Sequence, residues 1–274
     1  MSAEEEHSAL ELGLLLEAIY QKYHYDFRQY AEASLRRRLS AALVQLRCAT
    51  LSDLQRRVLH EPKAFSELLR FLTVQVSELF RDPPYYRAIR ERVLPYLRTY
   101  PSIKIWVAGC STGEEAYSLA IILQEEGLLD RAMIYATDIN GESLRAAEAG
   151  VYQSDRFARF SENYLAAGGR GSLSEFYTAN YASAVMDRSL RKAILFSDHS
   201  LATDSTFAEV ELVSCRNVLI YFERELQERA IGVLRDSLCR KGFLGLGSKE
   251  TLRFSAHAPA FTEFASDERI YQRI

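Results

Sequence analysis

The spacing of apolar side chains divides the chain into two regimes. Across residues 9–98, Leu, Ile, Phe and Val recur every three or four positions, which is typical of one face of an amphipathic helix. Four segments carry this pattern: "ALELGLLLEAIYQKY", "EASLRRRLSAALVQL", "TLSDLQRRVLHE" and "KAFSELLRFLTV". Thr50 and Ser52 are side chains suited to begin a helix. We therefore expect an all-α domain over residues 1–90.

After Pro101 short apolar runs alternate with helical patterns. "IKIWVAG", "AMIYATD", "KAILFSD" and "VELVSCRN" read as buried strands, and "EEAYSLAIILQEE" and "GESLRAAEAG" read as helices. "FERELQERAIGVLRDSLCRKG" predicts a long helix before the strand "FLGLGS", and "FTEFASDERIYQRI" predicts a hairpin. This alternation indicates an α/β domain over residues 91–274, with a parallel sheet covered on both faces. Residues 160–192 interrupt it with aromatics and a Gly-rich turn, so we expect a small β insertion there.

Composition places the chain among ordinary globular proteins, with 48% hydrophobic and 26% charged residues. No apolar run approaches the length of a membrane span, and the acidic start "MSAEEEHSALELG" is unlike a signal peptide. We therefore expect a cytoplasmic protein. The four cysteines form no CxxC or Cys/His cluster, so neither structural zinc nor a disulfide framework is expected.

Charge is unevenly distributed, because Lys and Arg exceed Asp and Glu over residues 21–100 although the whole chain is at −3. Arg36, Arg37 and Arg38 are consecutive and thus about 100° apart on a helix, so not all three can face the core. They form either an ordinary solvated helix face or a docking surface for an acidic partner.

The stretch "VAGCSTGEEAYS" joins the first predicted strand to the next helix. Gly109 and Gly113 allow a sharp turn and a close approach of a ligand. The stretch has neither the Lys of a phosphate-binding loop nor a full G-x-G-x-x-G, and Glu114 and Glu115 begin the helix instead. Two carboxylates would repel a pyrophosphate and suit a cationic cofactor, although acids in a first helical turn also simply complement the helix dipole.

Asp138 ends the second predicted strand, at about the spacing from the glycine loop at which nucleotide-binding α/β folds place an acid for the ribose hydroxyls. A helix N-cap for "GESLRAAEAG" is the alternative role. We favour ribose binding.

Four stretches, in order, resemble the CheR type of chemotaxis receptor methyltransferases: "ELFRDPPYY", "AGCSTGEEAYSLAI", "YATDIN" and "CRNVLIYF". The resemblance spans most of the chain. It implies a helical N-terminal domain joined to a Rossmann-like class I methyltransferase domain that carries a small β-subdomain. It further implies methyl transfer from S-adenosylmethionine to glutamate carboxylates of a methyl-accepting chemoreceptor, which gives methyl esters and S-adenosylhomocysteine.

The resemblance also implies residue roles. Arg81 is expected to orient the substrate glutamate and Tyr221 to lie at the same mouth; alone, the first would be a salt-bridge partner of Asp82 or Glu78 and the second an interior aromatic. The expected cofactor-binding residues are Ser77, Arg81, Gly109, Glu114, Asp138, Ser200, Leu201, Arg216 and Asn217. Glu114 is chosen over Glu115 for the methionyl end. The arginine triplet Arg36, Arg37 and Arg38 becomes a candidate for receptor docking, and no metal is expected.

Two departures from the family pattern keep an alternative open. Gln75 and Ser200 stand where relatives have asparagine. A non-catalytic adaptor that binds S-adenosylmethionine or its product is therefore a second hypothesis. A nucleic-acid methyltransferase would need a base-flipping motif, and a dehydrogenase would need its glycine fingerprint; neither is found.

Overall fold

The computed structural model describes residues 3–274, and its contacts divide the chain into two compact units. The smaller unit contains the residues up to Val74 together with Ile220–Arg229, and the larger contains Gln75–Leu219 and Ala230–Ile274. The division at Val74 differs from the expected boundary at residue 90. Its physical reason is the burial of Tyr85 and Tyr86 in the core of the larger unit, which ties the intervening segment to the sheet.

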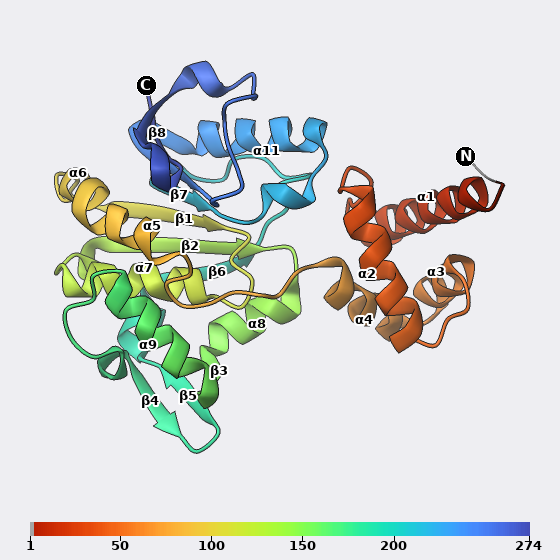
Figure 1. The fold of residues 1–274 in the computed structure, drawn as a ribbon, viewed down its shortest axis with the longest axis horizontal. Coiled ribbons are helices and arrows are strands. Elements are labelled where there is room, and N and C mark those ends of the chain that lie inside the picture. Colours follow the sequence, from red (N-terminus) through yellow and green to blue (C-terminus); the bar gives the residue numbers. More distant parts are fainter. Residues whose placement is uncertain (1–2) are drawn as a thin grey trace. The chain divides into compact units, whose positions relative to one another are not determined.

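The smaller unit is helical, as expected. Its helices are α1 (Ala3–Tyr23), α2 (Glu32–Gln45), α3 (Leu51–His60) and α4 (Pro62–Leu72) (Figure 1). The Thr50 side chain accepts the N–H of Asp53 and so caps α3. None of the helices in the described part of the chain has the length and apolar character that a bilayer span requires.

The later segment Ile220–Arg229 joins this helical unit through its backbone. The N–H of Ala31 donates to the Tyr221 carbonyl at 2.8 Å, and the N–H of Glu223 donates to the Gln29 carbonyl at 2.8 Å. The rings of Tyr30 and Phe222 meet edge to face, with centroids 4.9 Å apart. Tyr221 therefore belongs to the helical unit although it lies far along the sequence.

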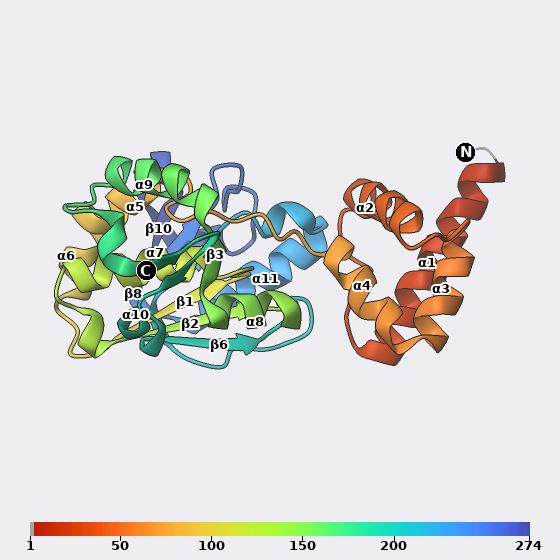
Figure 2. The same ribbon diagram turned by 90° about the horizontal axis from the view of Figure 1, so that it is seen from below.

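A seven-stranded sheet forms the centre of the larger unit. In spatial order its strands are β6 (Ile194–Asp198), β2 (Ala132–Asp138), β1 (Ile103–Ala108), β7 (Val210–Cys215), β8 (Leu238–Leu246), β10 (Ile270–Arg273) and β9 (Phe261–Ala265). The first five are mutually parallel, and the C-terminal hairpin adds β10 and β9 antiparallel. Figures 1 and 2 show β1, β2 and β6 side by side. The α/β class and the hairpin are thus confirmed.

The larger unit contains the helices α5 (Pro83–Ala88), α6 (Leu94–Leu97), α7 (Glu114–Glu125), α8 (Gly141–Ala149), α9 (Phe157–Ala166) and α10 (Arg188–Lys192), and the part of α11 (Arg224–Ser237) that follows Arg229. One sequence expectation fails here, because α11 ends at Ser237 and "LCRKG" is the start of β8. Leu238 is fully buried and pairs with Val210 of β7, so tertiary pairing outweighs the helical pattern of this stretch.

The insertion is a separate three-stranded antiparallel sheet in the order β3 (Val151–Gln153), β5 (Ser183–Met186) and β4 (Tyr177–Asn180). It therefore begins earlier in the chain than the expected residue 160, and α10 follows it before β6. The Tyr152 hydroxyl donates to the Thr112 carbonyl at 2.7 Å, which ties this small sheet to the glycine loop of the main sheet.

The strand order reverses at β1, since the chain continues on one side into β2 and later returns on the other side as β7. In open α/β sheets a crevice opens beyond the carboxyl ends of the strands at such a point. The loops that follow β1, β2 and β7 therefore define where a ligand belongs.

Candidate functional site

The loop after β1 is a tight turn that only glycine fits. Gly109 has φ +73°, and a Cβ at this residue would lie 2.5 Å from a Val218 methyl carbon. The N–H groups of Gly109 and Cys110 both donate to the Thr137 carbonyl at 2.8 Å. Gly113 has φ +93°, and its Cβ would lie 2.8 Å from that of Ala147. Both glycines thus bring backbone close to neighbouring elements at the entrance to α7.

Asp138, at the end of β2, faces this loop. Its Oδ2 accepts the Ser111 N–H at 2.9 Å and its Oδ1 accepts the Asn140 N–H at 2.9 Å. Burial raises the pKa of Asp138 above its ordinary value, although these backbone donors act in the opposite direction. The N-cap of α8 is Asn140, whose side chain accepts the N–H groups of Glu142 and Ser143. The capping role weighed against ribose binding therefore falls to Asn140 rather than Asp138.

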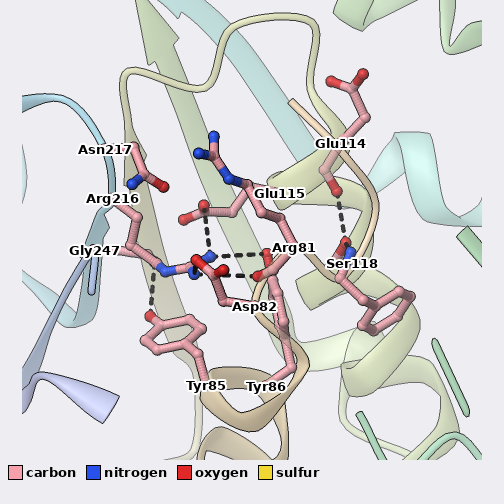
Figure 3. Close-up of polar contacts among 12 residues, drawn as sticks. Arg81, Asp82, Tyr85, Tyr86, Glu114, Glu115, Ser118, Arg216, Asn217 and Gly247 are labelled. Atoms are coloured by element: carbon pink, nitrogen blue, oxygen red, sulfur yellow. Dashed lines mark hydrogen bonds and ion pairs between the residues drawn. The ribbon is translucent and has the colours of Figure 1, made fainter. Parts of the chain in front are cut away.

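The two glutamates at the start of α7 diverge (Figure 3). The Glu114 side chain is fully buried, lies 2.9 Å from the Arg156 guanidinium and accepts the Thr112 hydroxyl at 2.7 Å. Glu115 Oε2 lies 3.4 Å from Arg216 Nη1. Glu114 Oε1 and Glu115 Oε1 are both buried and accept no hydrogen bond from the described residues, but Glu114 Oε1 lies 2.9 Å from Arg156 Nη2 whereas Glu115 Oε1 has no ion-pair partner among them. An acceptor free to receive a ligand donor is thus present on Glu115, whereas Glu114 serves an internal ion pair.

Arg216 is the centre of the polar cluster in Figure 3, and 2% of its side chain is exposed. Its Nη2 donates to Asp82 Oδ2 at 2.8 Å and to the Arg81 carbonyl at 3.1 Å. The guanidinium carbon lies 4.1 Å from the centre of the Tyr85 ring. Burial acts to lower the pKa of Arg216, but Glu115 leads several groups that outweigh it, so the pKa is raised and the group stays charged.

The motif "ELFRDPPYY" is held against α7. The Phe80 N–H donates to the Ser118 hydroxyl at 2.8 Å, and that hydroxyl donates to the Glu114 carbonyl at 2.7 Å. Among the described residues Arg81 forms no ion pair, and its guanidinium donates only to the Val76 carbonyl at 3.4 Å. Neither salt bridge considered for Arg81 forms within the described chain, since Asp82 pairs with Arg216 and Glu78 lies 3.9 Å from Arg159 and accepts a hydrogen bond from Asn163.

The remaining expected cofactor residues are placed less directly. Asn217 follows Arg216 after β7, at the reversal of strand order. The Ser77 carbonyl accepts a hydrogen bond from Arg156. The Ser200 hydroxyl accepts the Ala202 N–H at 3.3 Å, so it caps a local turn, and Leu201 is buried. The structure thus brings Gly109, Asp138, Arg216 and Asn217 to the carboxyl ends of the strands, and adds Glu115.

The arginine triplet is unevenly exposed. Arg36 pairs with Glu32 at 2.7 Å, whereas Arg37 is exposed. Arg38 donates to the Leu72 carbonyl, and its guanidinium lies 4.6 Å from the centre of the Tyr221 ring. Docking through the triplet stays a prediction, with Arg37 its most accessible member. Tyr221 and Arg81 belong to different compact units, so joint action of the two also stays a prediction.

Two residues of this region carried no signal in the sequence. Arg156 neutralises the buried Glu114 from the insertion, and Glu250 accepts backbone N–H groups of the loop after β7. Adjacent acids gave the only sequence signal for Glu115, and helical geometry turns the two neighbouring side chains about 100° apart, so they face different surroundings.

The chain is similar to known methyltransferases over nearly its whole length. The family described as "CheR methyltransferase, all-alpha domain" matches residues 10–73, and "CheR methyltransferase, SAM binding domain" matches residues 75–269. "Putative methyltransferase Cher3" of Pseudomonas putida is 55% identical over 98% of each chain. A "Chemotaxis protein methyltransferase" of Listeria monocytogenes is 31% identical over 83% of this chain and 84% of its own. An uncharacterised 104.1 kDa protein of Rhodobacter capsulatus is 29% identical over 88% of this chain, which spans 25% of that protein.

The sheet order, the glycine loop and the acids around it, taken with these matches, define an S-adenosylmethionine-dependent methyltransferase. The residues suit that cofactor, because the Glu115 oxygen without a described partner can accept an ammonium donor and the loop from Gly109 to Glu115 contains no phosphate-binding lysine. The chain belongs to the CheR methyltransferase family, the S-adenosylmethionine-dependent protein-glutamate methyltransferases.

Proposed function

We propose that the substrate is the cytoplasmic region of a methyl-accepting chemoreceptor or a related signalling protein, whose glutamate side chains become methyl esters. The support is the family match over both domains and the relatives described as chemotaxis protein methyltransferases. Glutamate-rich receptor helices would be attracted by the basic N-terminal segment, most directly by the exposed Arg37.

The chemistry needs positioning more than proton transfer. Bound S-adenosylmethionine supplies a methyl group on a positively charged sulfur, which an ionised glutamate can attack without a general base. The protein then has to hold two charged partners in line and exclude water.

We assign Glu115 to the ammonium of the methionyl end and Asp138 to the ribose hydroxyls. The observation that carries this assignment is the buried Glu115 Oε1 at the start of α7, which has neither a hydrogen-bond nor an ion-pair partner among the described residues, whereas Glu114 Oε1 is paired with Arg156. Arg81 is proposed to hold one oxygen of the substrate carboxylate, because its guanidinium has no carboxylate partner within the described chain. Tyr221 is proposed as a neighbour of the substrate on the basis of the family resemblance.

The test combines binding and transfer. Calorimetry with S-adenosylmethionine and S-adenosylhomocysteine should show association with both. Radiolabelled methyl groups should move to cytoplasmic fragments of chemoreceptors from the same cell and be released as methanol in alkali, since esters hydrolyse and methylated bases do not. Binding without transfer to any fragment would overturn the proposal and indicate the adaptor alternative.

A further inference from the structure

A buried carboxylate joins the loops that follow β7 and β8. Glu250 is 5% exposed. Its Oε2 accepts the N–H of Asn217 at 2.9 Å and that of Gly247 at 2.6 Å, and its Oε1 accepts the N–H of Val218 at 2.9 Å. The Glu250 N–H donates in turn to the Gly247 carbonyl at 2.9 Å. Three backbone donors from two loops therefore converge on one side chain.

The loop held in this way places Asn217 in an unusual conformation. Its φ is +59°, in the left-handed region, which costs energy even for asparagine. The N–H groups of Asn217 and Val218 belong to the two peptide planes on either side of the Asn217 Cα. A single carboxylate that accepts both groups fixes those planes, and thereby fixes the direction in which the Asn217 side chain leaves the backbone.

Gly247 packs closely against both Asn217 and Glu250. A Cβ at residue 247 would lie 2.8 Å from the Asn217 nitrogen, 2.9 Å from its Nδ2 and 2.7 Å from Glu250 Oε2. Contacts this short do not occur for real side chains, so any larger residue would displace the asparagine. Asn217 and Gly247 lie next to Arg216 in the cluster of Figure 3.

We infer that Glu250 is a positioning residue for cofactor binding, acting through Asn217. The inference rests on the proposed function and on the cofactor contact that the family resemblance implies for Asn217, which lies at the reversal of strand order. Glu250 is suited to this role because an ionised carboxylate only accepts hydrogen bonds and can satisfy several N–H groups at once.

Glu250→Gln is the first test. The amide retains one acceptor oxygen but turns an NH2 group toward backbone donors, so at least one hydrogen bond is lost and the loop is pushed apart. We expect the Kd for S-adenosylhomocysteine, measured by calorimetry, to rise about tenfold, as for one lost hydrogen bond to a charged group. The KM for S-adenosylmethionine should rise similarly, while the KM for a receptor fragment stays unchanged.

Gly247→Ala is a second perturbation with the same expected signature, because its Cβ would displace both Asn217 and the Glu250 carboxylate without removing any charge. Glu211→Gln is the matched control. Glu211 also accepts a backbone N–H, that of Lys104 at 2.6 Å, but at the amino ends of β1 and β7. Its substitution should leave the Kd for S-adenosylhomocysteine unchanged.

A double substitution tests whether Glu250 acts through its neighbour. Asn217→Gly removes the amide and tolerates the positive φ. If the inference holds, Glu250→Gln adds little to the loss of affinity that Asn217→Gly already causes. Full additivity would contradict it.

A purely structural role predicts a different result. Glu250→Gln would then lower the melting temperature and the fraction of active molecules, with the Kd for S-adenosylhomocysteine unchanged, and this would overturn the inference. If Glu250→Gln does not fold, Gly247→Ala decides in the same way. A wild-type protein that binds S-adenosylhomocysteine but methylates no receptor fragment would refute the proposed function alone, because calorimetry on the variants still tests Glu250.

Discussion

The adjacent glutamates at the start of α7 allow a direct test of the cofactor site. Glu115→Gln removes a charge that faces Arg216 and carries the free acceptor oxygen, whereas Glu114→Gln removes the partner of Arg156. The two changes are chemically identical and one residue apart. They should nevertheless affect different properties.

For Glu115→Gln the expected loss is one hydrogen bond between a carboxylate and the ammonium of the cofactor. Such a bond contributes about 1.5–3 kcal/mol, so the Kd for S-adenosylhomocysteine should rise about ten- to a hundredfold. Arg216 keeps Asp82 at 2.8 Å, so the fold should lose little.

For Glu114→Gln the loss is one of folding stability. Breaking a buried pair costs about 3–5 kcal/mol, but the Arg156 side chain is 34% exposed, so about 2 kcal/mol is expected. For a unit of this size that lowers the melting temperature by about 4–8 °C.

Calorimetry with S-adenosylhomocysteine and thermal melting of the same preparations separate the two effects. Glu148→Gln, an exposed change on α8, is the control and should alter neither quantity. Weakened binding in Glu114→Gln together with unchanged binding in Glu115→Gln would refute the assignment and restore Glu114 as the methionyl contact.

Three further predictions concern the surrounding framework. Arg156→Ala should lower the melting temperature by at least as much as Glu114→Gln, since it leaves the Glu114 carboxylate buried without an ion-pair partner, whereas Arg159→Ala, an exposed change, should be neutral. Gly109→Ala should abolish measurable binding of S-adenosylhomocysteine, because its Cβ would meet a methyl group of Val218. The raised pKa of Asp138 means that this carboxylate takes up a proton at a higher pH than an ordinary aspartate. On acidification the affinity for the cofactor, measured by calorimetry, should therefore already fall at a pH above 3.8.

Each of these predictions has a contrary outcome. Equal melting temperatures of the Arg156→Ala and Arg159→Ala variants would show that the buried α7 carboxylate is satisfied in another way. Full affinity in Gly109→Ala would show that the turn can relax, and Val218→Ala combined with it should restore part of any loss. A flat affinity profile on acidification, identical to that of Asp138→Asn, would remove Asp138 from the ribose site.

The periodicity of apolar residues was sufficient to predict the class of most elements. The helical segments before residue 73 bury one face and the buried strands are mostly apolar, so each pattern fits one type of element. It failed at "LCRKG", where a strand partner outweighs local preference. It also placed the domain boundary too late, because the burial of Tyr85 and Tyr86 depends on contacts with the sheet that no local pattern reveals.

The site was predictable only where function requires a side chain of a particular type after a particular strand. Asp138 and Arg216 follow their strands directly, so sequence placed them at the correct edge of the sheet. Glu250 was invisible because its partners are backbone N–H groups, which every residue except proline provides. Whether Glu114 or Glu115 faces the cofactor depends on the orientation of α7, which tertiary packing determines.

The charge balance around Arg216 explains why an arginine can be buried where a cationic cofactor is expected. One guanidinium faces two carboxylates, those of Glu115 and Asp82, and Asp138 adds a third acid at the end of β2, on the other side of β1 from the strand that Arg216 follows. Arg216 is thereby fully neutralised, and an excess of negative charge remains. In a site of low dielectric this excess favours a cation far more than it would in water. The arginine therefore holds the acids together without repelling the sulfonium. Replacing Arg216 by a neutral residue should leave the carboxylates repelling one another and so raise their pKa values. It should not improve cofactor binding.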